Sequence, residues 1–583
     1  MTENDTGLDE DITTLASDYT PDFETGATAG GGTGRGAVNA VRSFSRARIE
    51  LRPEIPEMKE ETLAALIAMG GIYQRGGKIA TAGRTLMITQ QGPVVALQAV
   101  RMQRGSLLDA MARAAEWHRR VMGKHGPEEV PCNPSRDVAE ALLTQTVDLP
   151  LPPLSGIATA PFLRRDGSLC MPPVSGAHYD STTGLYLDGA GVVFEPPVAG
   201  ATRADALAAV EELFAPMREF DFVGGTRGIA ACAAMAALLT PFARPACAAV
   251  PGFLFTAPVK GSGKSMLASL APLLATGSPA GLISPTRGES EEFEKRLNAA
   301  LLTGRPHHLI DNIENDHWGV PLLCSALTEP VIDLRPLGTS DLVPTPNTYQ
   351  FALTGNNVTP PGDVSRRVVT CRLVPDTEDP AAREFDFDPR AEVLAKRVPL
   401  TRAALTILMA YQVEYGAGRR MRGREMGSFE DWTRLVRDAL VWLGFDDCVV
   451  ASEAAPDEKR DTLAAFLAAW RDLPRAALSS DGVPVADMVR VAAATSERDE
   501  GSDGGEIVHP AFREALLAAV PERGGGLPSA QRIGKWLASE VDRRVPGGQG
   551  GTLYVAREGG SNMGVRWSLR SSENRSRQSG SLL

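Results

Sequence analysis

The stretch APVKGSGKSML, residues 257–267, decides which fold we expect for this chain of 583 residues. It follows the short apolar run GFLF at 252–255 and leads into KSMLASLAPLL, which reads as the start of a helix. Backbone N–H groups can converge on a phosphate at such a junction, because glycines leave room for it and the helix dipole favours an anion. The stretch therefore predicts a phosphate-binding loop between a strand and a helix.

One position departs from the usual pattern of such loops, G-x-x-x-x-G-K-[ST]. Pro258 stands where the first glycine is usually written, but that glycine only begins the loop, and proline can occupy the extended entry to a turn. Lys264 is expected to place its charge between the β- and γ-phosphates, and Ser265 to ligate Mg²⁺. A plain glycine-rich turn is the alternative. The residues predicted to hold the nucleotide are Gly261, Ser262, Gly263, Lys264, Ser265 and Met266.

Two later apolar strands are predicted to end in polar side chains. HHLIDNIEND places Asp311 at the end of one, 47 residues after Lys264, and YQFALTGNN places Asn356 at the end of the other, 45 residues beyond Asp311. The carboxylate can hold magnesium through water, as a Walker B aspartate does, and the amide can orient the attacking water in a sensor role. Strands also end in Asp or Asn because these residues make turns. Three strand ends in this order and spacing favour the nucleotide site.

Bulk composition sets limits on the class of protein. The chain is 43% hydrophobic and 23% charged, which is ordinary for a globular protein, and its length predicts several domains. Its net charge of −12 argues against coating nucleic acid with the whole surface, though not against local basic patches. The seven scattered cysteines form no C-x-x-C pair, which argues against a disulfide framework or a zinc knuckle. We find no uninterrupted apolar run near the roughly 20 residues of a membrane span, and the start of the chain is acidic. We expect a soluble, cytoplasmic protein without a membrane partner.

Changes in composition along the chain predict an order of domains. An acidic, then glycine-rich start cannot bury enough apolar surface to order itself, whereas residues 250–375 alternate short strands and helices. The predicted parts are a disordered tail at 1–45, a mixed α+β region at 46–215, an α/β ATPase domain at 216–425, a helical domain at 426–500, a winged-helix-like domain at 506–570 and a second tail at 571–583.

With these residues in hand, the chain resembles the AAA+ ATPase part of phage and prophage primase-helicase proteins, a group related to superfamily 3 helicases. The pieces that carry the resemblance are GSGKS, EEFEKRL, LIDNIEN, LRPLGTSD, TGNN and GDVSRRV, in that order, and it covers about 50 to 570. It implies a P-loop AAA+ core, ATP and Mg²⁺ as cofactors, and a homo-hexamer that threads one DNA strand through a central pore in a bacterial host. The first 250 residues show no convincing primase centre, so a separate primase or polymerase is an expected partner.

The resemblance leaves the catalytic base open. AAA+ ATPases usually carry Glu directly after the Walker B Asp, whereas Asn312 follows Asp311 here. Glu314, two residues on, is a candidate base, although we expect a strand to point it differently from Asn312. Arg366 and Arg367, past the sensor strand, occupy the place where a ring-forming ATPase presents an arginine to the neighbouring subunit's γ-phosphate. A solvated basic turn is the alternative, and Arg335 is a second candidate for that role.

The last part of the chain predicts a DNA-binding module. HPAFREALLAAV and PSAQRIGKWLASEVDR read as two helices, and GTLYVAREGGSNMGVRWSLR reads as a hairpin, which is the order of a winged helix. A protein-docking winged helix is the alternative. The basic residues expected to contact DNA are Arg532, Lys535, Arg557 and Arg566, with Arg543, Arg544 and Arg570 as further phosphate contacts.

Three functions remain open on the sequence. The leading hypothesis is an ATP-dependent DNA helicase of a phage or prophage replication system that acts on single-stranded and forked DNA. The second is an AAA+ ATPase that loads, remodels or initiates on DNA, or serves in defence or packaging, without unwinding. The third, which depends on Asn312, is a DNA-binding scaffold that binds nucleotide without turnover.

Overall fold

The computed structural model divides the chain into two units, Met1–Ala454 and Ala455–Leu583, each with its own core. The two are described separately. The residues that the structure describes are 46–89, 92–145, 149–285, 290–314, 318–336, 342–375, 385–421, 426–449, 458–480, 482–495, 507–522, 526–546, 552–558 and 565–572. The predicted tails at 1–45 and 571–583 lie outside these residues, except for the last residues of the final strand.

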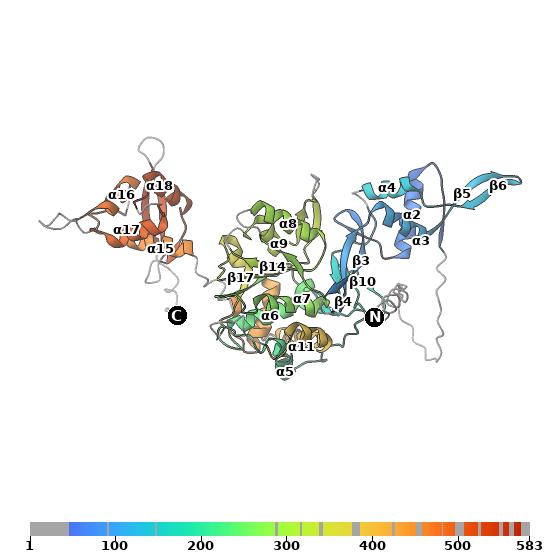
Figure 1. The fold of residues 1–583 in the computed structure, drawn as a ribbon, viewed down its shortest axis with the longest axis horizontal. Helices are drawn as coiled ribbons and strands as arrows, with labels where there is room; N and C mark the ends of the chain where they lie inside the picture. The colour runs from blue at the N-terminus through green and yellow to red at the C-terminus, as the bar shows by residue number, and fades with distance from the viewer. Residues whose placement is uncertain are drawn as a thin grey trace, which may run out of the picture. The chain divides into compact units, whose positions relative to one another are not determined.

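A five-stranded sheet with parallel pairing throughout lies at the centre of the first unit (Figure 1). Its order is β13-β14-β17-β12-β18, so the first of these strands in the chain, β12, lies between the last two. The strands are β12 (Gly252–Ala257), β13 (Gly281–Ile283), β14 (His307–Ile313), β17 (Gln350–Asn356) and β18 (Val368–Arg372). Every residue of β12 is buried, as expected for an inner strand of a parallel sheet covered on both faces. The predicted α/β class is confirmed.

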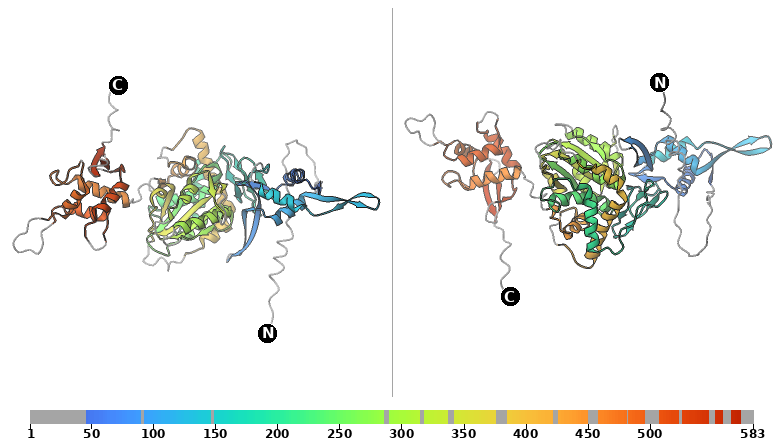
Figure 2. Two further views of the ribbon diagram at one scale, coloured as in Figure 1. Left: turned by 90° about the horizontal axis from the view of Figure 1, so that it is seen from above. Right: turned by 60° about the horizontal axis from the view of Figure 1, so that its bottom comes forward.

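Alternating residues of the sheet feed two separate cores. Phe253 and Phe255 belong to one hydrophobic cluster, and Leu254 between them belongs to the other. The larger cluster contains helices α5, α6, α7, α10 and α11, and the smaller contains α8 and α9. Figure 2 shows the central sheet and its helices from two further sides. Their bounds are α5 (Arg203–Phe214), α6 (Ile229–Ala243), α7 (Lys264–Thr276), α8 (Ser290–Leu302), α9 (Pro321–Thr328), α10 (Pro389–Ala395) and α11 (Arg397–Gly416).

Helix α6 is apolar on all sides, and nearly all of its residues are buried. The window Ile229–Ala246 is long and apolar enough to cross a membrane, but 83% of it is buried inside the protein. A helix that is hydrophobic all round can be a core helix of a large domain. Here it packs against α7, α11 and β18 and supports one face of the central sheet.

The N-terminal part of the first unit has its own small core, built on three helices and two sheets. The elements are β1 (Ala47–Glu50), α2 (Ile55–Met69), β2 (Tyr73–Arg75), β3 (Lys78–Thr89), β4 (Gly92–Arg101), α3 (Arg104–Ala114), β5 (Ala115–Gly123), β6 (Gly126–Pro131) and α4 (Arg136–Thr144). The β5–β6 hairpin extends beyond the three helices (Figure 1).

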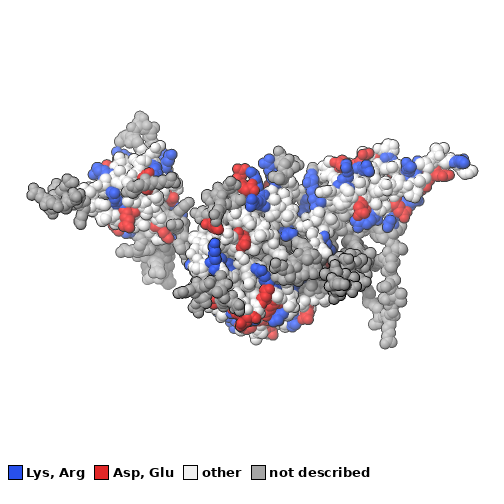
Figure 3. Space-filling model, viewed as in Figure 1, with Lys and Arg blue, Asp and Glu red and all other residues white. Residues whose placement is uncertain are grey.

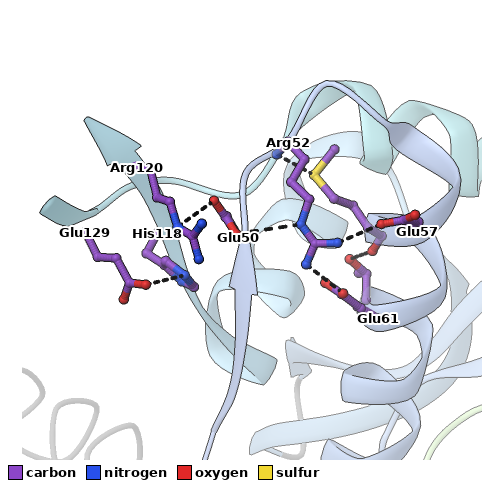
Figure 4. A network of polar contacts seen from close by, with 9 residues as sticks. Glu50, Arg52, Glu57, Glu61, His118, Arg120 and Glu129 are labelled. Carbon is purple, nitrogen blue, oxygen red and sulfur yellow. Dashed lines mark hydrogen bonds and ion pairs between the residues drawn. The ribbon is translucent and has the colours of Figure 1, made fainter. Parts of the chain in front are cut away.

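A network of ion pairs attaches this hairpin to the helices (Figure 4). Arg52 forms ion pairs with Glu57 and Glu61 of α2 at 2.8 and 2.9 Å. Glu50 at the end of β1 lies 3.2 Å from Arg120 of β5 and 3.9 Å from Arg52. These charges are partly exposed, so they orient the hairpin more than they stabilise the fold.

Short strands connect this part to the central sheet. They are β7 (Gly156–Ala158), β8 (Phe162–Leu163), β9 (Leu169–Cys170), β10 (His178–Asp180) and β11 (Leu185–Leu187), with the hairpin β15 (Val331–Leu334) and β16 (Val343–Pro346) farther along the chain. Arg75 fixes the connection, because it donates to the carbonyl of Ser155 at 2.8 Å and to the hydroxyl of Tyr349 at 3.2 Å.

The cores divide the chain differently from the predicted domains. Helix α5 packs on α11, so the expected boundary at 215 falls within the larger cluster. The expected helical domain at 426–500 is split: residues 426–449 join that cluster, through Trp432 among others, whereas 458–493 join the core of the second unit. These helices have similar composition, and only long-range packing assigns each to a core.

In its described residues, the second unit combines four helices with a three-stranded sheet. Its elements are α15 (Glu458–Arg471), α16 (Val485–Ala493), α17 (Pro510–Ala519), α18 (Ala530–Ser539), β19 (Val545–Pro546), β20 (Thr552–Glu558) and β21 (Arg566–Ser572). The predicted helix, helix, hairpin order from 510 onward is present. The sheet order is β19-β20-β21, with antiparallel pairing.

Candidate nucleotide-binding site

The predicted phosphate loop lies at the carboxyl edge of the central sheet. β12 ends at Ala257, and α7 begins at Lys264. Gly261 and Gly263 have φ of +77° and +79°, in the left-handed region that side chains avoid. A Cβ on Gly263 would lie 2.7 Å from the ring of Phe220, so close packing also requires glycine there. In open parallel sheets, ligands bind beyond the carboxyl ends of the strands, where the strand order reverses.

The Lys264 ammonium is held by its own loop. The side chain is buried, and Nζ donates to the carbonyl oxygen of Val259 at 2.9 Å and to Ser262 Oγ at 2.7 Å. Burial lowers the pKa of Lys264 below its ordinary value, and the nearby Asp311 carboxylate opposes part of that shift. Both acceptors are neutral, and charged phosphate oxygens would form stronger hydrogen bonds with this ammonium.

Ser265 and Asp311 meet at the same edge. Ser265 Oγ donates to Asp311 Oδ1 at 2.8 Å, and the hydroxyl of Thr354 in β17 donates to the same oxygen. The site thus combines a hydroxyl from α7, a carboxylate from β14 and a second hydroxyl from the strand between β14 and β12. Thr354 is a site residue that the sequence reading missed, although it stands two positions before Asn356 in LTGNN.

A β-bulge shapes the strand that carries Asp311. The pairing of β14 with β17 shifts between Ile310 and Ile313, and Asn312 has φ of +59°. The backbone N–H of Asn312 donates to Thr354 Oγ1 at 3.1 Å, and its side-chain Nδ2 donates to Glu314 Oε1 at 3.3 Å. The expectation that a strand points Glu314 differently from Asn312 does not apply, because β14 ends at Ile313, before Glu314, and the side chains of Asn312 and Glu314 touch.

Asn356 also lies at this edge. It is the last residue of β17 and pairs in register with Ala257, directly before the phosphate loop. Its side-chain Oδ1 is buried and has no hydrogen-bond partner within the described parts of the chain. A buried polar atom of this kind requires a partner such as water or a ligand. Five predicted site residues thus lie on neighbouring elements at one edge of the sheet: Lys264, Ser265, Asp311, Asn356 and Glu314.

The two candidate finger arginines lie elsewhere. They end a 3-10 helix, η4 (Gly362–Arg367), just before β18, whose first residue pairs with the first residue of β12. They therefore lie at the amino edge of the sheet, opposite the loop. Arg366 is 67% exposed and pairs with Asp363 at 3.1 Å, whereas Arg367 is 15% exposed and donates to the carbonyl of Asp363. Arg335 follows β15, and its backbone pairs with the side chain of Asn298.

The candidate DNA contacts of the second unit differ in how free they are. Lys535 on α18 and Arg557 on β20 are exposed. Arg532 forms an ion pair with Glu522, and Arg566 donates to the carbonyl of Gly482 at 2.7 Å. The further candidates are partnered too, Arg543 with Glu540, Arg570 with Glu558, and Arg544 over the ring of Tyr554.

The surface charge shown in Figure 3 does not mark a stronger candidate for a nucleic-acid interface. Basic and acidic side chains are interspersed over the face shown in Figure 3. Among the described residues, no group of three or more His, Cys, Asp or Glu could hold a metal ion. The Ser265–Asp311 pair is therefore the metal-binding candidate that the sequence and the geometry share.

Comparisons with known proteins add little to this geometry. No protein-family model and no curated protein matches the chain. Among solved structures, the apo C-terminal region of NrS-1 is similar with a TM-score of 0.33 and 10% identity over 73% of this chain and 88% of that one. The SCCmec type IV Cch active helicase has a TM-score of 0.30 and 12% identity, over 86% of this chain and 97% of that one. JCV helicase has a TM-score of 0.18 and 15% identity, over 42% of this chain and 67% of that one. Similarity at this level does not establish a shared fold or activity.

Proposed function

We propose that the protein is an ATP-dependent DNA helicase or translocase of a phage or prophage replication system. The observation that carries the ATPase part is the 2.8 Å hydrogen bond between Ser265 and Asp311 beside the glycine loop. A hydroxyl and a carboxylate at this place are the groups that hold Mg²⁺ on a bound nucleotide in P-loop enzymes. The motor part of the proposal depends on the sequence resemblance and on the exposed Arg366.

The residues fit Mg²⁺ and ATP. The donor set is hydroxyl and carboxylate oxygen, which Mg²⁺ prefers, and a bound Mg²⁺ neutralises charge that develops on the transferred phosphoryl group. The loop N–H groups and Lys264 would hold the phosphates, and Ser265 and Asp311 would hold the metal. Asn356 orients the attacking water with its unpartnered Oδ1. Glu314 takes the proton from that water, and Asn312 holds the Glu314 carboxylate in place.

The position of Arg366 supports hydrolysis at a subunit interface. An exposed arginine at the amino edge of the sheet cannot reach the loop of its own chain, which leaves it free to serve a neighbouring copy. Such an arginine stabilises charge in the transition state. We propose a homo-hexameric ring in which single-stranded DNA passes through the centre and the second unit, as a winged-helix-like module, contacts DNA with Lys535 and Arg557.

Lys264→Ala tests the nucleotide site. We expect ATP hydrolysis to be lost and the circular dichroism spectrum and melting temperature to stay near wild type. Lys260→Ala is the matched control, since Lys260 is exposed in the same loop and should leave turnover close to wild type. Equal turnover in the two variants would exclude the assignment of Lys264.

DNA assays then separate the functions. Stimulation of ATP turnover by single-stranded DNA together with displacement of a forked strand supports a helicase. Stimulation without displacement supports a loader or remodeller. Nucleotide binding without turnover in the wild-type protein supports the scaffold that Asn312 suggests.

A further inference from the structure

A cavity of about 370 Å³ lies at the opposite edge of the central sheet from the phosphate loop. His307 and Gln350, the first residues of β14 and β17, line it, together with residues around β7, β8 and β11. Asp311 lies four residues along β14 from His307, about 13 Å away at the rise of a strand. The cavity is therefore distinct from the nucleotide site.

The charge of the cavity lining is one-sided. Most of the lining is apolar, with Phe162, Phe242 and Leu185 among its side chains. Two arginines, Arg165 and Arg244, line it, and none of the described lining residues is Asp or Glu. His307 adds no positive charge near neutral pH, because burial lowers its pKa to about 4. The lining thus favours a negatively charged group.

Arg244 is a buried cation whose hydrogen bonds go to neutral acceptors. It is 7% exposed and donates to the carbonyl oxygens of Tyr349 and Cys247 at 3.1 and 2.9 Å, and to Asn347. A buried charge without an opposite charge is costly, and an anion in the cavity would remove that cost. Arg165, at the exposed side, forms a long ion pair with Asp431 at 3.7 Å.

Gln350 gives the lining a buried acceptor that has no donor within the described part of the chain. Gln350 is 5% exposed, and its Nε2 donates to the carbonyl of Ala237 at 3.1 Å. Its Oε1 is buried without a hydrogen-bond donor among the described residues. A molecule with an N–H or O–H group would satisfy this acceptor.

We propose that this cavity is a second ligand site, which binds a small amphipathic anion with an apolar body, one acidic group and one N–H or O–H donor. Its volume lies within the range of small-molecule sites, which are mostly apolar with a few convergent polar groups. Arg244 and Arg165 bind the acidic group, Gln350 accepts from the donor, and the apolar walls cover the body. The site does not depend on the proposed ATPase activity.

A fluorescent probe of this chemical class tests the proposal in the full-length protein. 8-Anilinonaphthalene-1-sulfonate has two aromatic bodies, a sulfonate and an N–H, and N-phenyl-1-naphthylamine is the same molecule without the sulfonate. We expect saturable binding of one equivalent of the sulfonate, with weaker binding of the neutral compound.

Two variants at exposed lining positions place the probe without disturbing the core. Ala248→Trp narrows the cavity and should weaken binding of both compounds on the order of tenfold. Arg165→Gln should weaken binding of the sulfonate about two- to fivefold and leave the neutral compound unchanged. Ala68→Trp and Arg402→Gln are matched exposed controls outside the lining and should match wild type.

Two results with these variants would contradict the proposed cavity site. If Ala248→Trp binds the sulfonate as tightly as wild type does, the dye binds elsewhere and the proposal is overturned. The proposal is also overturned if Arg165→Gln loses affinity for the sulfonate and the neutral compound equally. Lys264→Ala should bind the sulfonate as wild type does. This variant separates the two proposals, since it removes ATP turnover and leaves the cavity intact.

Discussion

Ser265 and Asp311 are joined by a hydrogen bond of 2.8 Å, although one lies in the first turn of a helix and the other lies near the end of a strand 46 residues later. The bond exists because the carboxyl ends of parallel strands meet at one edge of the sheet, where α7 also begins. Thr354 donates to the same carboxylate oxygen from the strand between. Two hydroxyls therefore fix the orientation of the proposed metal-binding carboxylate.

Thr354→Val should weaken the proposed metal site without removing a metal ligand. The valine keeps the shape of the side chain but no longer holds Asp311, and losses of such supporting contacts typically cost about 10- to 100-fold in metal affinity or activity. We expect the Mg²⁺ concentration for half-maximal ATP turnover to rise while the fold is retained. Thr401→Val is the control, because the hydroxyl of Thr401 is buried without a hydrogen-bond partner among the described residues. Identical Mg²⁺ curves for the two variants would show that Thr354 does not position Asp311.

Glu314→Gln should separate nucleotide binding from hydrolysis. The amide cannot accept a proton, and removal of a general base typically lowers turnover about 100- to 10,000-fold. ATP affinity, measured with a fluorescent analogue, should stay near wild type, because Glu314 lies outside the phosphate loop. Glu329→Gln, at an exposed position after α9, is the control. Normal turnover in Glu314→Gln would mean that another group activates water.

The loop and strand ends of this site could be predicted because they are local features. A buried strand, glycines and a helix start follow one another between 252 and 276, and polar residues at the ends of apolar runs mark the sheet edge. The bulge at Asn312 could not be predicted, since it depends on the pairing of β14 with β17. For the same reason the sequence showed neither the role of Thr354 nor the contact between Asn312 and Glu314.

Features that are assembled from segments far apart in the chain could not be predicted from the sequence either. The division near 454 depends on which core each helix joins, and the helices around Trp432 and Trp470 have similar compositions. The cavity beside Arg244 is built from segments between 155 and 350 that no local pattern connects. Whether the loop, the arginines and the C-terminal module act as proposed stays a prediction.

Arg366→Ala should lower ATP turnover without affecting nucleotide binding. A finger arginine typically contributes about 1,000-fold or more to turnover. Mixing Arg366→Ala with Lys264→Ala subunits should restore part of the activity, because a Lys264→Ala copy supplies Arg366 to the intact loop of an Arg366→Ala copy. Arg402→Ala, an exposed arginine on α11, should be fully active alone. Arg366→Ala turnover at the wild-type level would exclude the role, and failure of the mixture would exclude sharing between subunits.

Acid should destabilise the first unit through its two buried histidines. Burial lowers the pKa of His307 from the ordinary value of 6.5 to about 4, and the pKa of His308 to about 3. In the folded protein both side chains therefore stay neutral when the pH falls below 6.5. The unfolded chain takes up these protons as the pH falls from 6.5 towards 4, so the free energy of unfolding should fall by up to about 1.4 kcal/mol per pH unit for each histidine. His308 stacks on Phe351, so His308→Phe should be tolerated and should flatten this dependence in urea unfolding. The control His125→Phe, at an exposed position, should leave the pH dependence of the free energy of unfolding unchanged. If His308→Phe shows the same pH dependence as wild type, His308 does not contribute to the loss of stability in acid.

Lys535 and Arg557 should account for more DNA binding by the second unit than Arg532 does. Both are exposed on α18 and β20, whereas Arg532 is already paired with Glu522, so its charge is partly neutralised. Replacing a phosphate-contacting cation by alanine should weaken binding similarly across sequences and reduce the slope of log K against log salt by about 1. Fluorescence anisotropy without nucleotide, over a salt series, measures this for Lys535→Ala, Arg557→Ala and Arg532→Ala. Arg471→Ala, next to its partner Asp472 at the end of α15, is the control. If all four variants keep the wild-type slope, the module does not bind DNA through this face, and docking to a protein becomes the better explanation.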